Sequence, residues 1–288
     1  NIGMRTINIE PAKNIKVKEG ILTFRRYFNK KIASYIVNKF GKAKLITATN
    51  SFAHIDNLGE YLESLDILLD DDGVFFAQFP DARNLLKENQ FDTIYHEHLS
   101  YLSIRPLEKF FKSFGMRIFD VVKTPVHGGS VRIFVKFYDA KYAIRPSVQK
   151  FTDLEESKNI DKITTYLKFA QNIKKNRISL SKLLKKLKKE NKSIAGYGAP
   201  AKSTTLLHYF NIGKETLDFI VDDSPYKQGL FTPGKHIPVV ATEELYTKKP
   251  DYVLILAWNF TDSIMKIHKK FADDGGKFII PVPVPIIV

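Results

Sequence analysis

Cysteine is absent from this chain of 288 residues. Its absence excludes disulfide bonds, zinc sites built from thiolates, and cysteine nucleophiles. The chain also has no run of about 20 apolar residues, the length that a membrane-spanning helix needs. Its first residues lack the basic and apolar regions of a signal peptide. Together these absences predict a cytoplasmic protein that has no membrane partner.

Acidic residues are scarcer than basic ones, 31 against 45, so the formal net charge is +14. This excess predicts an anionic partner, which could be nucleic acid, a membrane surface or a phosphorylated metabolite. Lysine and arginine are densest within residues 174–192, where leucines recur at helical spacing. Because that run has no aromatic side chain to stack on bases, we interpret it as the solvated face of an amphipathic helix and predict no nucleic-acid partner.

Strand-like and helix-like segments alternate along the chain on both sides of this basic stretch. Such alternation indicates an α/β fold with a doubly wound sheet, and the length suggests two domains. We expect a first domain over residues 1–147, a helical connection over 148–192 and a second α/β domain over 193–288. Within the first domain, the pattern predicts a helix ending near Gly20 and a turn over residues 70–73.

A cluster of chemically active side chains follows the strand-like run that ends at Pro80. Tyr95, His96, Glu97 and His98 are consecutive. Histidine exchanges protons near neutral pH, a carboxylate can orient it, and a phenol can hydrogen-bond an oxygen that gains negative charge. This set can remove a proton from a carbon beside a carbonyl and hold the enolate. The alternatives are a polar surface loop and a metal site at the two histidines, for which no third ligand has suitable spacing.

A glycine-rich loop opens the second α/β segment. Gly196 and Gly198 follow a strand pattern and precede a helical one, as in half of a dinucleotide fingerprint. In such a loop, backbone N–H groups and a helix N-terminus face a phosphate. Lys202 would add positive charge, and Asp222 or Asp223 ends the next strand pattern. We therefore expect a phosphate site, the alternative being an ordinary turn between strand and helix.

Further polar residues lie at the ends of the first predicted strands. Glu10 ends the first strand, where an acidic residue accepts hydrogen bonds from ribose hydroxyls in nucleotide-binding folds. Asn50 and His54 follow the next strand, and the carboxyl ends of parallel strands share one edge of the sheet. We therefore expect His54 and His98 to face one cleft, although His54 taken alone is more typical of a structural histidine.

Residues 89–101 (NQFDTIYHEHLSY) resemble the signature of S-adenosylmethionine-dependent sugar C-methyltransferases, which act on keto-deoxysugars linked to a nucleoside diphosphate. Other segments resemble that family in the expected order. They are Glu10-Pro11, Phe52-Ala53-His54, His127-Gly128-Gly129-Ser130, residues 196–202, Asp222, residues 225–229, Ala257-Trp258-Asn259 and Pro281-Val282-Pro283.

The resemblance implies a partial methyltransferase sheet of Rossmann-like type, followed by a second, C-terminal Rossmann-like α/β unit. It implies that His98 removes the proton beside the ketone, that Glu97 orients His98, and that Tyr95 and His54 hold the substrate and the enolate. Glu10 and Asn50 would bind the methyl donor. The residues implied for the nucleoside-diphosphate sugar are Gly196, Tyr197, Gly198, Lys202, Asp222 and Asn259.

Two family features are missing from this chain, namely a cysteine-rich zinc-binding region and a glycine-rich loop for the methyl donor. We therefore expect an N-terminally incomplete member, with zinc in the missing region alone. An NAD-dependent oxidoreductase built on the Gly196–Lys202 loop and a non-catalytic fragment that binds a nucleotide sugar are the alternatives. The sequence makes no prediction of oligomeric state.

Overall fold

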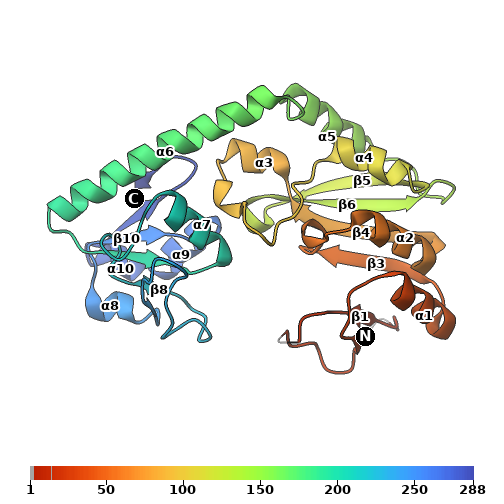
Figure 1. The fold of residues 1–288 in the computed structure, drawn as a ribbon, viewed down its shortest axis with the longest axis horizontal. Helices are drawn as coiled ribbons and strands as arrows, with labels where there is room; N and C mark the ends of the chain where they lie inside the picture. The colour runs from red at the N-terminus through yellow and green to blue at the C-terminus, as the bar shows by residue number, and fades with distance from the viewer. Residues whose placement is uncertain (1–2, 14) are drawn as a thin grey trace. The chain divides into compact units, whose positions relative to one another are not determined.

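The computed structural model describes residues 3–13 and 15–288, which form two compact units. Unit 1 holds the described residues up to Phe79, with Ile104–Val122 and Arg132–Phe151. Unit 2 holds Pro80–Ser103, Lys123–Val131 and Thr152–Val288. Figure 1 shows the elements of both units coloured along the chain. The domain boundaries expected near residues 147 and 192 stay a prediction.

Unit 1 is built on a four-stranded sheet with the order β3-β4-β6-β5. Its strands are β3 (Ala43–Thr49), β4 (Leu69–Pro80), β5 (Met116–Thr124) and β6 (Ser130–Phe137). A separate parallel pair consists of β1 (Ile7–Ile9) and β2 (Leu22–Phe24). Because β3 and β4 are also parallel, their carboxyl ends lie at the same edge of the sheet.

Three helices and a 3-10 turn belong to unit 1: α1 (Lys30–Phe40), η1 (Phe52–His54), α2 (Leu58–Leu68) and α4 (Ile104–Lys112). Helix α1 begins after Asn29, whose side chain accepts a hydrogen bond from the N–H of Ile32. Such an N-cap satisfies one of the free backbone donors at a helix start. Buried Ile32 and Ile36 of α1 pack with Ile9 of β1 and Ile46 of β3, so both sheets share one core.

The helix expected before Gly20 is wrong. The structure has no helix among the described residues between Pro11 and Gly20, and none of these side chains is buried. A helix so short depends on tertiary packing for its stability, and the described side chains of this segment bury no apolar face.

The turn expected over residues 70–73 is also wrong, because these residues belong to β4. Asp70 pairs with Lys44 at 2.6 Å and Asp71 pairs with Lys42 at 2.8 Å, which ties the acidic run to β3. The pairing register shifts between Ala43 and Leu45, so the extra residues form an irregular bulge within the strand. The local kink is therefore present, but as a β-bulge and not as a turn that ends a strand.

Unit 2 contains a six-stranded sheet with the order β12-β11-β10-β7-β8-β9. The strands are β7 (Ile194–Tyr197), β8 (Ile220–Val221), β9 (Val239–Val240), β10 (Tyr252–Ile255), β11 (Lys277–Ile280) and β12 (Ile286–Ile287). All pairs are parallel except that of β11 with β12. This is the strand order 3-2-1-4-5-6 of dinucleotide-binding folds, and it reverses direction between β7 and β10. Ligands of such sheets bind beyond the carboxyl ends of the strands at that point.

Helices cover both faces of this sheet. Ile194 belongs to an apolar cluster with Leu184 of α6 (Ile163–Lys189) and Leu206 of α7 (Ala201–Tyr209). Its neighbour Ala195 belongs to a different cluster, which includes residues of α8 (Glu244–Lys248), α9 (Thr261–Ile267) and α10 (Lys269–Asp273). Successive strand residues face opposite sides, so the sheet is buried on both faces. The protein is therefore of the α/β class, with a doubly wound second unit.

The long helix α6 has the amphipathic character that its sequence predicts. Leu180, Leu184 and Leu187 are buried, whereas Lys182 and Lys185 are exposed to solvent. Helix α5 (Pro146–Ser157) precedes it, so helices occupy most of the stretch expected to be helical. Within residues 3–13 and 15–288, no helix combines the length and the hydropathy that a membrane span requires.

Candidate active site

The loop that carries the histidine cluster is anchored in unit 2. It contains the 3-10 turn η2 (Phe91–Thr93), and the buried ring of Phe91 stacks on Phe210 with centroids 5.0 Å apart. The hydroxyl of Thr205 on α7 donates a hydrogen bond of 3.5 Å to the carbonyl of Ile94. The loop is therefore fixed by core packing and lies on the helix that follows the glycine-rich loop.

A second anchor joins this loop to the chain's last segment. The side-chain amide of Asn89 donates to the carbonyl oxygen of Pro283 at 3.0 Å. Asn176 of α6 donates to the same carbonyl oxygen. One backbone oxygen thus links the start of the loop, the long helix and the tail of unit 2.

The contacts of His98 set its tautomer. Its Nδ1 lies 2.8 Å from the carbonyl oxygen of Thr93, and its Nε2 lies 3.2 Å from the hydroxyl of Tyr95. A carbonyl only accepts hydrogen bonds, so Nδ1 carries the hydrogen and Nε2 of the neutral ring has the lone pair. Burial, with the nearby charge of Glu97, raises the pKa of Tyr95. Tyr95 therefore stays a hydrogen-bond donor beside a ring nitrogen that can accept a proton.

The other predicted members of the cluster are more exposed. His96 and Glu97 point into solvent, with Glu97 Oε1 at 4.0 Å from His96 Nε2. The orienting contact of His98 comes from the backbone of Thr93, and the orienting role of Glu97 stays a prediction. His54 ends η1 in unit 1, whereas His98 lies in unit 2, so their shared cleft also stays a prediction.

Four side chains meet at the carboxyl end of the six-stranded sheet. The Nζ atom of Lys202, on α7, lies 3.4 Å from the ring centroid of Trp258 and donates to Asn259 Oδ1 at 2.7 Å. Trp258 belongs to η4 (Trp258–Phe260), and its Nε1–H donates to Asp92 Oδ2 at 2.6 Å. Since α7 follows β7 and η4 follows β10, this group lies where the strand order reverses.

Burial perturbs the charges of this group. It raises the pKa of Asp92 to about 6, against the opposing effects of the Lys202 charge and the Trp258 hydrogen bond. It also lowers the pKa of Lys202 to about 8, against the attraction of Asp92. Burial and the Lys202 charge together lower the pKa of His127. Perturbed groups of this kind concentrate at functional sites, because few folds tolerate buried charge without a use for it.

The glycine-rich loop is held by the acid that follows β8. Asp222 is buried and accepts hydrogen bonds from the N–H groups of Ala199 at 2.7 Å and Ser224 at 2.9 Å, and it pairs with Lys227 at 3.2 Å. Asp223 accepts hydrogen bonds from Tyr197 and Thr242. Both acids that a dinucleotide fingerprint offers to a ribose are thus bound to the protein itself. This disfavours the NAD alternative, and substrate contact by Asp222 stays a prediction.

Gly198 needs its lack of a side chain. Its φ is +86°, and a Cβ built there would lie 2.6 Å from the Cβ of Ala257. Glycine alone combines that backbone conformation with such close approach. Gly196 lies within β7 and not after it as expected, whereas Gly198 follows the strand and α7 begins at Ala201. The predicted order of strand, glycine turn and helix is confirmed.

Unit 1 places Glu10 and Asn50 at strand ends, as the sequence predicts. Glu10 follows β1, and its Oε1 accepts a hydrogen bond from the N–H of Ala12 at 2.8 Å. Asn50 follows β3, and its Oδ1 accepts from Gln78 Nε2 at 3.1 Å. Gln78 in turn accepts from Arg132 Nε at 2.8 Å. The amide of Asn50 is thereby held in place by β4 and β6.

Sequence reasoning missed Asp92 and Trp258 as members of the site. Both lie in segments that carry the family resemblance, but their contact joins residues 166 positions apart. No local pattern shows that an acid beside Phe91 becomes fully buried. In the part of the chain that the structure describes, no group of three or more histidine, aspartate or glutamate side chains is arranged to hold a metal ion.

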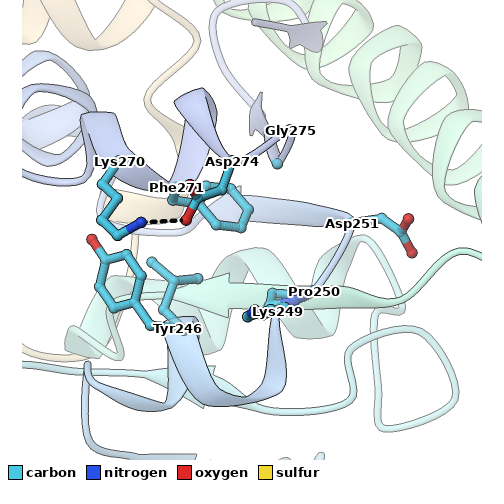
Figure 2. A pocket seen from close by; sticks show the side chains of 10 residues that line it. Tyr246, Lys249, Pro250, Asp251, Lys270, Phe271, Asp274 and Gly275 are labelled. Atoms are coloured by element: carbon cyan, nitrogen blue, oxygen red, sulfur yellow. Dashed lines mark hydrogen bonds and ion pairs between the residues drawn. The ribbon is translucent and has the colours of Figure 1, made fainter.

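A separate pocket of about 350 Å³ lies between α8 and α10 (Figure 2). Tyr246, Lys270 and Asp274 line it, with Lys270 and Asp274 paired at 2.7 Å. Asp251, also in its wall, precedes β10, so the pocket lies at the amino edge of the sheet. Sites of α/β sheets form at the opposite, carboxyl edge, where Lys202 and Trp258 lie.

Comparison with known proteins defines the class. The methyltransferase domain model matches residues 3–121, and the C-methyltransferase C-terminal domain model matches residues 125–283. C-methyltransferase NovU of Streptomyces niveus is 36% identical over 289 residues, which cover 99% of this chain and 69% of NovU. The fold and these matches define an S-adenosylmethionine-dependent C-methyltransferase. The chain belongs to the C-methyltransferase family, and its N-terminal incompleteness, with zinc in a missing region, stays a prediction.

Two solved structures resemble the chain over less than half of its length. An S-adenosylmethionine-dependent methyltransferase of Anabaena variabilis gives a TM-score of 0.36 at 16% identity, covering 46% of this chain and 68% of that one. M1.HpyAVI gives a TM-score of 0.26 at 12% identity, covering 47% and 58%. Similarities this low carry no argument, and the family rests on the sequence matches.

Proposed function

We propose that this C-methyltransferase methylates the carbon next to the ketone of a keto-deoxysugar linked to a nucleoside diphosphate. The geometry of His98 carries the proposal. Its Nδ1–H is held by the carbonyl of Thr93 at 2.8 Å, which leaves Nε2 as the proton acceptor. A general base must act through such a lone pair, within hydrogen-bond reach of the proton it removes.

The residues of this chain account for the formation of an enolate. His98 Nε2 takes the proton from the carbon, and the electrons of the broken C–H bond form the enolate. The Tyr95 hydroxyl, which donates to Nε2 across 3.2 Å in the free protein, turns to the substrate oxygen on which negative charge develops and so leaves the Nε2 lone pair open to the proton. S-adenosylmethionine, when bound, supplies an electrophilic methyl group to the carbon so activated. His98 then releases its proton to solvent, which restores the base.

Glu10 and Asn50 fit the nucleoside part of the methyl donor. One carboxylate oxygen of Glu10 accepts a hydrogen bond from the N–H of Ala12. An acid in this position after a strand suits ribose hydroxyls. Gln78 donates a hydrogen bond to the side-chain oxygen of Asn50, so this contact does not use the NH₂ group of Asn50. Donor binding by these two residues is supported by this chemistry and by their places at strand ends.

The second α/β unit fits the diphosphate of the sugar nucleotide. Lys202 supplies a cation at the point where the strand order reverses, and the N-terminus of α7 begins one residue before it. Backbone donors and positive charge together suit a phosphate. We place the substrate's diphosphate beside Gly196–Lys202, with Asn259 close to the same oxygens.

Hydrogen–deuterium exchange tests the proposal without any methyl donor. The protein is incubated in deuterium oxide with a keto-deoxysugar linked to a nucleoside diphosphate, and mass spectrometry follows deuterium uptake beside the ketone. The intact protein should catalyse exchange, and His98→Ala should not. Methyl transfer from labelled donor without any exchange would contradict the enolate mechanism. A change in NADH absorbance with the same sugar would favour the oxidoreductase alternative.

A further inference from the structure

The ammonium group of Lys202 lies against η4, and η2 holds η4 in place from the side. The Nζ atom lies 3.4 Å from the ring centroid of Trp258 in η4, well inside the range of a cation–π contact. Asn259 accepts one of its hydrogen bonds at 2.7 Å. Asp92 of η2 holds the same indole from its edge, through the Nε1–H bond of 2.6 Å. The cation is thus fixed through a ring that an acid keeps in place.

Asp92 is costly to bury. Its side chain is 0% exposed, and its Oδ1 has no hydrogen-bond partner among residues 3–13 and 15–288. A buried carboxylate without full pairing destabilises a fold, and apolar residues of similar size often give equal or better stability. Stability of the fold therefore does not explain this acid. Fixing a charge in one position does explain it.

We propose that Asp92 and Trp258 are positioning residues, which hold the Lys202 ammonium in place to receive the diphosphate of the substrate. The proposal rests on the function proposed above. Trp258 provides the surface on which the ammonium lies, and Asp92 provides both the hydrogen-bond acceptor for the indole and the opposite charge. Asn259 provides an acceptor that a phosphate oxygen can replace when the substrate binds.

The same residues link the cation to the base. Asp92 and Thr93 belong to one 3-10 turn, and the carbonyl of Thr93 orients His98. Asp92 is also close enough for its charge to raise the pKa of Tyr95. A displacement of Asp92 therefore affects the diphosphate site and the base together. This explains why an acid placed before the histidine cluster is tied to a tryptophan far along the chain.

The titratable groups that face Lys202 are Asp92 from η2 and His127 from the 3-10 turn η3 (Val126–Gly128), while η4 contributes the uncharged Trp258 and Asn259. Burial lowers the pKa of Lys202 to about 8, and Asp92 opposes that shift. Lys202 is therefore cationic below pH 8 and loses its charge above it. Diphosphate affinity should fall as the pH rises through this value.

Trp258 is the single tryptophan of the sequence, so indole fluorescence reports on this site alone. In the ligand-free protein of residues 1–288 we expect emission to change in two steps, near pH 6 for Asp92 and near pH 8 for Lys202. Lys202→Gln should remove the upper step. Asp92→Asn should remove the lower step and move the upper one to lower pH by about one pH unit, since the opposing charge is lost. Lys270→Gln, at an exposed lysine of α10, is the matched control and should keep both steps.

Calorimetry with inorganic pyrophosphate completes the test. Wild-type affinity should weaken at least about tenfold between pH 7 and pH 9, and Lys202→Gln should be weak throughout. Lys202→Arg should bind equally at both values, because a guanidinium keeps its charge. Trp258→Phe keeps a ring but weakens the cation–π contact with Lys202 and removes the donor to Asp92. The pH at which half of the pyrophosphate affinity is lost should therefore shift downward. Trp258→Phe serves as the second variant if Asp92→Asn does not fold.

Two results would overturn the proposal. One is an upper fluorescence step that Lys202→Gln or Asp92→Asn leaves unchanged. The other is equal pyrophosphate affinity in the wild type and Lys202→Gln. Neither measurement involves the sugar or the methyl donor. A failure of deuterium exchange with both results as expected would therefore reject the enolate mechanism and leave the positioning roles in place.

Discussion

His98 Nδ1 lies 2.8 Å from the carbonyl oxygen of Thr93, and this contact decides which nitrogen of the ring acts. The acceptor belongs to the backbone of η2, a 3-10 turn whose first residue, Phe91, is buried in the core. A side-chain substitution at Thr93 therefore cannot remove it. The orientation of the base is a property of the fold of the loop, and it is kept in any variant in which the loop keeps its backbone conformation.

Replacing His98 by alanine should lower methyl-transfer turnover by about 10²–10⁴-fold, the usual contribution of a general base. His96→Ala is the matched control, since its imidazole is adjacent in sequence but exposed. Single-turnover assays with labelled methyl donor measure both. Near-full activity of His98→Ala, or an equal loss in the control, would assign the base elsewhere.

Glu10→Gln should weaken binding of S-adenosylmethionine by roughly tenfold or more, since a charge-assisted hydrogen bond is worth about 1.5–3 kcal/mol. Affinity for a nucleotide sugar should not change, because that ligand is assigned to the second unit. Glu19→Gln, at an exposed acid of the same unit, is the control. Calorimetric titration of each ligand separates the two effects. Equal donor affinity in all three proteins would remove Glu10 from the donor site.

Asp222→Ala should reduce the free energy of unfolding by about 3 kcal/mol, since it leaves two backbone N–H groups and Lys227 without their acceptor. Asp273→Ala, which breaks an exposed pair with Lys269, should cost about 0.5 kcal/mol or less. Urea unfolding measures both. Similar values for the two variants would show that Asp222 does not support the glycine-rich loop.

His268 should make stability fall in mild acid. Its Nε2 lies 2.9 Å from the hydroxyl of Tyr197 and its Nδ1 lies 2.9 Å from that of Tyr246, and burial lowers its pKa despite the charge of Asp223. The unfolded chain therefore takes up a proton at higher pH than the folded one, so folding loses stability as the pH falls below about 6.5.

The comparison with His268→Gln isolates this contribution, because Asp92, whose pKa is raised, acts in the opposite direction at lower pH. The wild type should lose stability relative to the variant between pH 7 and pH 5. Denaturant titrations at several pH values follow the difference. A difference that stays constant over this range would rule out His268 as its source.

The basic surface of α6 should not confer tight binding to nucleic acid. Within residues 174–189, its exposed lysines, such as Lys182 and Lys185, are not interleaved with aromatic residues on which bases could stack. We expect weak association with random DNA that disappears near physiological salt. Fluorescence anisotropy at several salt concentrations measures it, and submicromolar affinity at 150 mM salt would contradict the prediction.

Local sequence patterns predicted much of the fold and the general chemistry of the site. The strand–glycine–helix order around Gly198 and the amphipathic character of α6 follow from short-range spacing, and both are confirmed. The bulge in β4 could not be predicted in this way. Asp70 and Gly73 have the composition of a turn, and only the pairing with β3 keeps them in a strand.

Long-range contacts account for what the sequence did not show in the site. The histidine cluster was recognisable because its members are consecutive. The environment of Asp92 was not recognisable, because it depends on Trp258 and Lys202. These two residues are far from Asp92 in the sequence, and the strand order of the six-stranded sheet brings them near it. Burial is a property of the assembled sheet, so the perturbed charges of the site appear only after folding.

The carbonyl oxygen of Pro283 accepts hydrogen bonds from both Asn89 and Asn176, and this has a consequence for the order of events during synthesis. Asn89 precedes Pro283 by 194 positions, so the loop of His98 acquires this anchor only after nearly all of the second unit has been made. The histidine cluster emerges early from the ribosome, but its loop is fully fixed late.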